Sequence, residues 1–190
     1  YQGKLSKQEL MAQIDYLVQK RYPAKLIPAK KFKIQFSRMG EPALNPHVLE
    51  VLRELPFTYN AHGLMPSLST IAPHGCDHFL DEILTIKDEF YDGGRFQLQF
   101  SIHTTDVELR NKIIPVRKWD FAKIGAYGER FYKDGDRKIT LNFALAEGSP
   151  ISPDVLSRYF SPEIFLLKMT PLNPTYKAQA NQLASYLHHE

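Results

Sequence analysis

Apolar residues recur along this chain with two periods, one typical of helices and one typical of strands. In the first segment Leu10 and Ile14 are about one helical turn apart, and Ser6 followed three residues later by Glu9 is the signature of a capped helix start. A Tyr-Pro pair then stops the pattern. The segment therefore predicts a helix over residues 6–22.

Strand-like and helical segments alternate through the rest of the chain. The strand-like segments are short runs rich in apolar residues, and the helical ones repeat apolar positions every three or four residues. Strands separated by helices at this spacing predict an α/β fold with a mainly parallel sheet, either a (β/α) barrel or an open doubly wound sheet. The predicted strands are 33–37, 67–71, 96–102, 138–145 and 164–169, and the further predicted helices are 46–55, 77–86, 119–132, 153–159 and 178–187.

Composition favours one folded domain over residues 1–190. The chain has 190 residues, of which 43% are hydrophobic, enough to bury a core. A single cysteine excludes an intrachain disulfide, and no apolar run is long enough to span a membrane. Since no signal peptide precedes the first helix either, we expect a cytoplasmic protein without a membrane partner.

The charge is mildly basic, at +3. This value is well below that of proteins whose charge alone indicates nucleic-acid binding. Two local basic groups are interpreted as solvated faces, although RNA binding through either stays open. These groups are Lys25, Lys30, Lys31, Lys33 and Arg38, and Arg110, Lys112, Arg117 and Lys118.

Polar residues follow the predicted strands at the points where the strands end. In parallel α/β sheets the ligands gather at the carboxyl ends of the strands, which all lie at one edge of the sheet. We therefore expect these residues to form one rim. They are Ser37 to Glu41, Ser69 to Thr70, Ser101 to Thr104, Ala146 to Glu147, and Thr170 to Asn173.

Five of these segments, in this order, resemble the radical S-adenosylmethionine (SAM) 23S ribosomal RNA adenine C2-methyltransferases. The similarity covers most of the chain and implies a partial (β/α) barrel of the radical SAM type. The segments are Met39-Gly40-Glu41-Pro42, Leu68-Ser69-Thr70, Ser101-Ile102-His103, Arg110-Asn111-Lys112-Ile113-Ile114-Pro115-Val116, and Pro171-Leu172-Asn173-Pro174.

The resemblance implies SAM as the cofactor and assigns the residues that bind it. Glu41 would hold the methionyl amine, and Gly40 would let the backbone approach the ligand. For His103 the alternatives are a ligand contact, a metal ligand and a core histidine, and its position favours the first. No residue is predicted to be catalytic or to bind a metal. The remaining SAM contacts implied are Ser69, Ser101, Ile102, His103 and Asn173.

The chain departs from the family in its cysteines. The family holds a [4Fe-4S] cluster with a Cys-x-x-x-Cys-x-x-Cys motif on a loop before these segments, and here Cys76 is the single cysteine. The methyl-carrying cysteine near the family's C-terminus is also absent. We therefore expect a fragment of a radical SAM enzyme that lacks its first strand and is inactive as cut, with the cluster held in the parent protein only.

A missing first strand leaves the strand at 33–37 as an unpaired edge. Such an edge invites pairing, so we expect the helix at 6–22 to cover it, a second molecule to pair with it in a dimer, or the edge to be poorly ordered. A strand flanked on both sides within the chain would contradict this expectation.

Other functions stay open at this point. One alternative is a cluster-free module that keeps only the SAM pocket, and within the enzyme hypothesis the substrate is either RNA or protein. An unrelated hydrolase or sugar-phosphate barrel is disfavoured, since neither a Gly-x-Ser-x-Gly turn nor a phosphate loop is present.

The tract His74-Gly75-Cys76-Asp77-His78 contains metal-ligating residue types, but its spacing matches no familiar zinc pattern. We interpret Cys76 as a small residue near a helix start, a position that can lower the pKa of a thiol.

Overall fold

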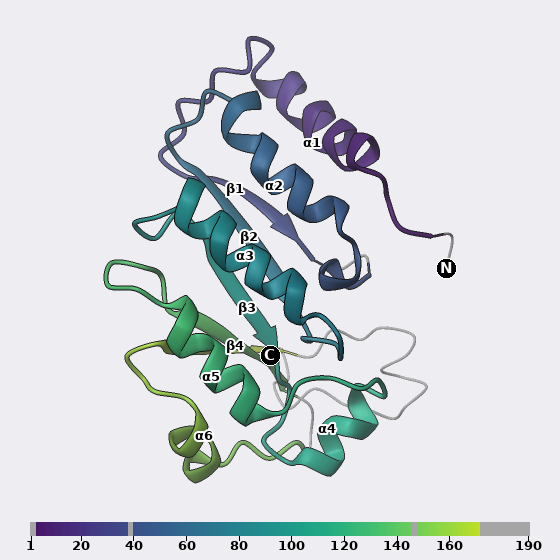
Figure 1. The fold of residues 1–190 in the computed structure, drawn as a ribbon, viewed down its shortest axis with the longest axis vertical. Helices are drawn as coiled ribbons and strands as arrows, with labels where there is room; N and C mark the ends of the chain where they lie inside the picture. Colours follow the sequence, from purple (N-terminus) through teal and green to yellow (C-terminus); the bar gives the residue numbers. More distant parts are fainter. Residues whose placement is uncertain (1–2, 38–39, 146–147, 172–190) are drawn as a thin grey trace, which may run out of the picture.

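The computed structural model describes residues 3–37, 40–145 and 148–171. Its centre is a sheet of five strands, all parallel, which lie side by side in chain order (Figure 1). This confirms the predicted α/β fold with a parallel sheet. The strands are β1 (Phe32–Phe36), β2 (Leu64–Thr70), β3 (Gln97–Ser101), β4 (Ile139–Leu145) and β5 (Phe165–Pro171).

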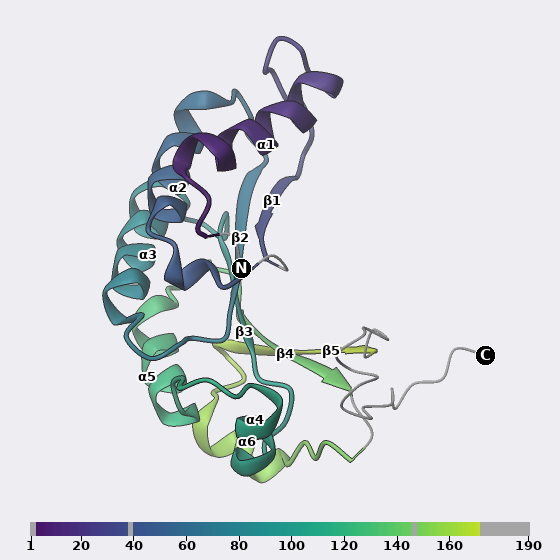
Figure 2. The ribbon, with the colours of Figure 1, turned by 90° about the vertical axis from the view of Figure 1, so that its right-hand side faces the viewer.

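The helices lie on one side of this sheet. Figure 2 shows that the sheet curves and that the helices follow its convex side, as in part of a (β/α) barrel. The other, concave face carries none of the described helices. The helices are α1 (Lys7–Arg21), the short 3₁₀ turn η1 (Pro42–Leu44), α2 (His47–Thr58), α3 (Asp77–Phe90), α4 (Val107–Ile113), α5 (Phe121–Phe131) and α6 (Pro153–Tyr159).

The first helix begins as its sequence predicts. The Ser6 hydroxyl accepts a hydrogen bond from the Glu9 amide, and the Glu9 carboxylate accepts one from the Ser6 amide, so two amides at the helix start are satisfied. Helix α1 packs against α2, and its Asp15 accepts a hydrogen bond from the Tyr59 hydroxyl at 2.7 Å. These contacts fix α1 to the helical layer.

The two faces of the sheet differ in chemistry. On the convex face Leu68, Phe100 and Leu141 are completely buried against the helices. Each such side chain contributes roughly 1.5–3 kcal/mol through removal from water. Alternate residues point to the concave face, where neighbouring strands carry Ser67 and Gln99. The convex face thus supplies the core.

Side chains on the concave face are joined by hydrogen bonds across the strands. Lys33 Nζ of β1 donates to Gln97 Oε1 of β3 at 2.7 Å, and Gln97 Nε2 contacts Thr140 Oγ1 of β4 at 3.4 Å. Gln99 Nε2 donates to Ser67 Oγ at 3.0 Å. This face is therefore polar, and its residues Ser67, Gln99 and Thr140 are buried.

Strand β1 lies at one edge of the sheet, with β2 as its neighbour among the described strands. This agrees with the edge position predicted for 33–37. The proposed missing strand and pairing with a second molecule stay predictions.

Several element boundaries differ from the predicted ones, and one α-helix was not predicted. Strand β2 begins at Leu64 rather than at residue 67. Pro66 lies within the strand, beside Ile34 of β1, whereas a proline in the sequence argues against a strand at that position. Helix α4 was not predicted. The Asp106 side chain caps it by accepting from the Leu109 amide at 2.8 Å. The predicted helix 178–187 lies outside the described residues.

None of the described helices is long and apolar enough to cross a membrane.

Candidate functional site: the carboxyl-terminal rim of the sheet

The described candidate residues lie at one edge of the sheet, because all five strands run in the same direction. Strand β1 ends at Phe36, β2 at Thr70 and β3 at Ser101, and each candidate segment lies at or directly after one of these ends. The rim predicted from the sequence is therefore present for β1 to β3. The predicted segments Ala146 to Glu147 and Asn173 lie outside the described residues.

Glu41 is held at this rim by groups from two neighbouring strand ends. Its Oε1 accepts hydrogen bonds from the Thr70 hydroxyl at 2.5 Å and from the Ala43 amide at 3.0 Å, and its Oε2 accepts one from the Ile71 amide at 3.0 Å. Because a carboxylate offers about four acceptor positions, three donors leave one on Oε2. The carboxylate is thus fixed in orientation and keeps capacity for one more donor.

Gly40 has the geometry that the sequence motif requires. Its φ is +85°, a left-handed conformation that glycine adopts without steric cost. No described atom lies within 4 Å of the position that a Cβ would occupy. A ligand can therefore approach the backbone next to Glu41 from this side.

The predicted contacts on β2 and β3 fall into two classes. Ser69 and Ser101 are half-buried at the strand ends, with their side chains on the concave face. Ile102 is completely buried, and its amide donates to the Asn142 carbonyl of β4 at 2.9 Å. The two serines offer hydroxyls at the rim, whereas the Ile102 side chain belongs to the core.

His103 adopts a left-handed backbone conformation, with φ at +69°, which turns the chain at the end of β3. The Ala144 amide donates to its Nδ1 at 3.3 Å, so in the neutral ring the proton is on Nε2. Burial, and then the charge of Arg110, lower the pKa of His103 below its usual range. The ring is therefore kept neutral, with Nε2–H as a donor.

The segment after α4 docks against the loop that follows β2. The His74 amide donates to the Arg117 carbonyl at 2.8 Å, and the Trp119 amide donates to the Ala72 carbonyl at 2.8 Å. These bonds place Arg117 and the neighbouring Lys118 beside the rim. Two of the basic residues noted in the sequence thus flank the candidate site.

Arg110 is different from those basic residues, because it is buried. Its Nη1 donates to the Trp119 carbonyl at 2.8 Å, and its guanidinium lies 5.1 Å from the centre of the Phe121 ring. Burial lowers the pKa of Arg110 to about 10. Its Nε and Nη2 have no hydrogen-bond partner in the described part of the chain. Arg110 is therefore a buried cation with two nitrogens unpaired among the described residues, and the positive neighbour of His103.

The thiol of Cys76 does not have the lowered pKa suggested by its place before helix α3. The side chain is buried, and burial, followed by the charges of Asp77 and Glu41, raises the pKa of Cys76 to about 12. The sequence interpretation was wrong because it weighed the helix start and not burial. Within the described ranges, no three His, Cys, Asp or Glu side chains lie together as metal ligands would.

No protein-family model matches the chain. Two curated proteins with the name "Probable dual-specificity RNA methyltransferase RlmN" are similar to it. The one from Parafrankia sp. (strain EAN1pec) is 26% identical over 159 residues, and the one from Streptomyces griseus subsp. griseus is 27% identical over 154 residues. Each alignment covers 78% of this chain but 38% and 40% of the relative, so the chain spans less than half their length.

A solved structure has the same fold. The crystal structure of a radical SAM methyltransferase from Sphaerobacter thermophilus superposes with a TM-score of 0.66 and 22% identity, covering 90% of this chain and 49% of that one. The predicted resemblance to the radical SAM methyltransferases is confirmed. At this identity the structure shows the fold, which is the partial barrel expected from the sequence.

Sequence reasoning missed the groups that orient Glu41. The Thr70 hydroxyl and the Ile71 amide come from the strand next to β1, thirty positions along the chain. The sequence signal that could have revealed these groups is the threonine at the end of β2, because a hydroxyl at a strand end can contact the end of the neighbouring strand. The Ala43 amide was missed because the 3₁₀ turn was not predicted.

Proposed function

We propose that this chain is the SAM-binding core of a radical SAM, [4Fe-4S]-dependent enzyme of the RNA methyltransferase type. The single observation that carries the proposal is the carboxylate of Glu41, which is fixed by three donors at the rim and keeps one acceptor position. A methionyl ammonium is a donor that suits this position. The RlmN relatives and the radical SAM fold support the same assignment.

The rim residues suit a ligand that contains an amino acid and a nucleoside. Gly40 leaves open space beside Glu41, the hydroxyls of Ser69 and Ser101 provide polar contacts, and the neutral His103 offers an Nε2–H donor. When bound, SAM supplies the activated methyl or adenosyl group. The chain itself binds and orients the ligand and excludes water from it. Asn173 stays a proposed contact.

The described residues do not suit an iron–sulfur cluster. Such clusters are held by several thiolates, whereas Cys76 is buried and its raised pKa favours the thiol. We therefore propose that the cluster ligands belong to a longer parent protein, as the partial coverage of the relatives suggests. The chain by itself would then be inactive in radical chemistry.

RNA is the proposed substrate of the parent, on the strength of the RlmN relatives. Arg117 beside the rim is suited to a phosphate contact, which would make binding salt-sensitive. Lys118 is not, because its Nζ already donates to Asn111 Oδ1 and to the Ile114 and Val116 carbonyls. A modified protein remains the alternative substrate. The proposal also places the enzyme in the cytoplasm, where an RNA substrate would be found.

The test is SAM binding, measured by calorimetry with the wild-type chain and with Glu41→Gln. We expect the substitution to weaken binding about 10- to 150-fold, because it removes the charge from a hydrogen bond worth about 1.5–3 kcal/mol. Glu50→Gln is the matched control, since Glu50 is an exposed carboxylate on α2. Thermal unfolding of each variant checks the fold. Equal SAM affinity in all three proteins, or no binding at millimolar SAM, would refute the proposed site.

A cluster-free SAM-binding module is the second candidate, favoured by the single buried cysteine. The gene sequence upstream of Tyr1 separates the two. A Cys-x-x-x-Cys-x-x-Cys motif in frame supports the radical SAM enzyme, and a start codon without these cysteines supports the module.

Two structural predictions belong to the same proposal. Residues 1–190 would form one incomplete barrel domain, and the edge strand β1 would pair with a second copy when the chain is isolated. Sedimentation equilibrium over a range of concentrations measures this pairing. A monomer at every concentration would exclude the dimer and leave the SAM site untouched.

A further inference from the structure

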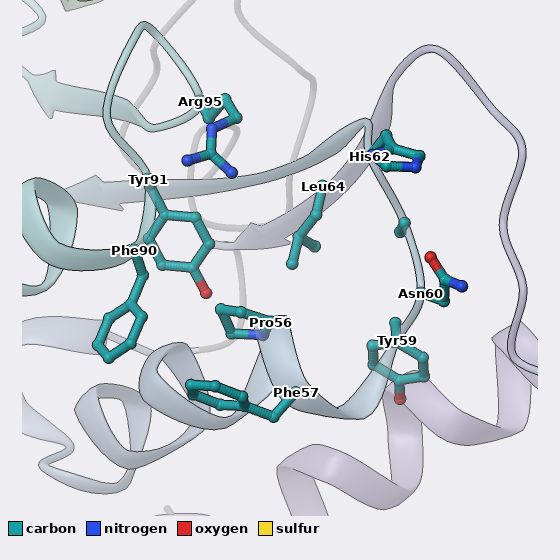
Figure 3. A pocket seen from close by; sticks show the side chains of 10 residues that line it. Pro56, Phe57, Tyr59, Asn60, His62, Leu64, Phe90, Tyr91 and Arg95 are labelled. Atoms are coloured by element: carbon teal, nitrogen blue, oxygen red, sulfur yellow. The ribbon is translucent and has the colours of Figure 1, made fainter.

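A cavity of about 410 Å³ lies at the end of the sheet opposite to the rim. It is enclosed by the last residues of α2, the connection into β2, the last residues of α3 and the turn that follows (Figure 3). Leu64 at the start of β2 lines it, whereas Thr70 at the end of β2 contacts Glu41. At about 3.3 Å per residue, the two sites are about 20 Å apart along the strand. The cavity is thus separate from the SAM site.

One side of the cavity is aromatic. The rings of Phe57 and Phe90 meet edge to face, 5.8 Å apart, and Phe57 is 79% exposed. The Tyr91 ring is buried beside them, and its hydroxyl is tied to the Leu52 carbonyl, so the ring is fixed. Figure 3 shows these rings around Pro56, and all of them line the cavity. An exposed phenylalanine beside a pocket offers a surface on which a flat ring can stack.

The opposite side of the cavity carries positive and polar groups. Arg95 and His62 come from the two turns that flank Leu64, and Figure 3 shows both across the cavity from Phe57. Arg95 donates from Nη2 to the Asp92 carboxylate at 2.6 Å and from Nε to the Asp92 carbonyl at 3.2 Å. Its Nη1 makes no hydrogen bond among the described residues. The ion pair with Asp92 offsets the charge of Arg95 but holds its guanidinium in place, and Nη1 stays available to donate to a ligand oxygen.

We propose that this cavity is a second ligand site, which binds a small planar aromatic molecule bearing a phosphate or carboxylate. The ring would stack on Phe57 and Phe90, and the anionic group would contact Arg95 and His62. The volume is within the range of small-molecule sites, roughly 300–1,000 Å³. The available Nη1 donor of Arg95 suits a phosphate or carboxylate oxygen, and the aromatic side suits a flat ring. The site is independent of the proposed SAM binding.

The first test uses three matched probes on the whole chain, which are 1-naphthyl phosphate, 1-naphthol and inorganic phosphate. Binding is measured by calorimetry, and amide chemical shifts locate the probe. We expect 1-naphthyl phosphate to bind at least tenfold more tightly than either of the others, with shifts at residues 56–64 and 90–95. Shifts confined to the rim residues 69–72 and 101–104, or equal affinity for all three probes, would overturn the proposal.

Two substitutions then separate the ring contact from the charge contact. Phe57→Ser and Arg95→Gln are both at exposed side chains, so the fold should be retained, and each is expected to weaken 1-naphthyl phosphate binding at least fivefold. Only Phe57→Ser should also weaken 1-naphthol. Lys138→Gln, which removes an exposed charge bonded to the Pro162 carbonyl, is the control and should change neither. Unchanged binding in both test variants would contradict the assigned contacts.

Discussion

The convex and concave faces of the sheet are made by the same five strands and contrast in almost every residue. On β3, Leu98 and Phe100 point to the helices and are buried, whereas Gln97 and Gln99 point to the concave face and bond to neighbouring strands. Fold stability comes mainly from the apolar face. The polar face can therefore vary at a smaller cost in stability, and this division is typical of barrels with many functions.

Substitution at neighbouring positions of β3 gives the largest expected difference between the faces. Phe100→Ala should lower the free energy of unfolding by about 3–5 kcal/mol, because it removes a completely buried ring and leaves a cavity. Gln99→Ala should cost about 1 kcal/mol, since it removes the single hydrogen bond to Ser67. Urea unfolding of both variants measures the difference. Similar losses would show that the polar face carries as much of the stability as the core.

A smaller effect is expected at His103, where the concave face meets the rim. The pKa of His103 is lowered in the folded chain. Below about pH 6.5, the usual pKa of histidine, the unfolded chain therefore binds a proton at this residue more readily than the folded chain does. Stability from this group is complete above pH 6.5 and is lost as pH falls through the folded pKa. His103→Asn, which tolerates the positive φ and keeps an acceptor for the Ala144 amide, should remove this dependence.

The measurement is the free energy of unfolding between pH 8 and pH 5 for the wild type and the variant. The other histidines are present in both proteins, so their contributions cancel in the difference. A difference that stays constant across this range would show that His103 is not held neutral by the fold.

Much of the fold follows from local sequence signals. The capping box at Ser6 and Glu9 and the alternation on β3 are short-range patterns, and the elements that they predict are present. Helix α4 was missed because its one buried residue is Arg110, which gives no apolar period. The start of β2 was missed because Pro66 is acceptable only when the neighbouring strand is known.

The candidate site likewise has residues that the local sequence predicts and residues that it does not. Gly40 and Glu41 could be proposed from the sequence because they are adjacent, follow a strand and resemble a family motif. The clamp on Glu41 needs Thr70 and Ile71, which reach it only once β1 and β2 have paired. The raised pKa of Cys76 likewise depends on burial, which its neighbours in the sequence do not reveal. Groups that act through tertiary contacts therefore required the structure.

SAM binding at the rim around Glu41 would be seen in a crystal structure of the chain grown with SAM. We expect the methionyl ammonium within hydrogen-bond distance of Glu41 Oε2, with the ligand beside Gly40 and the ends of β2 and β3. A rim free of SAM at saturating concentration, or SAM bound elsewhere with Glu41 contacting only Thr70, Ala43 and Ile71, would exclude this site.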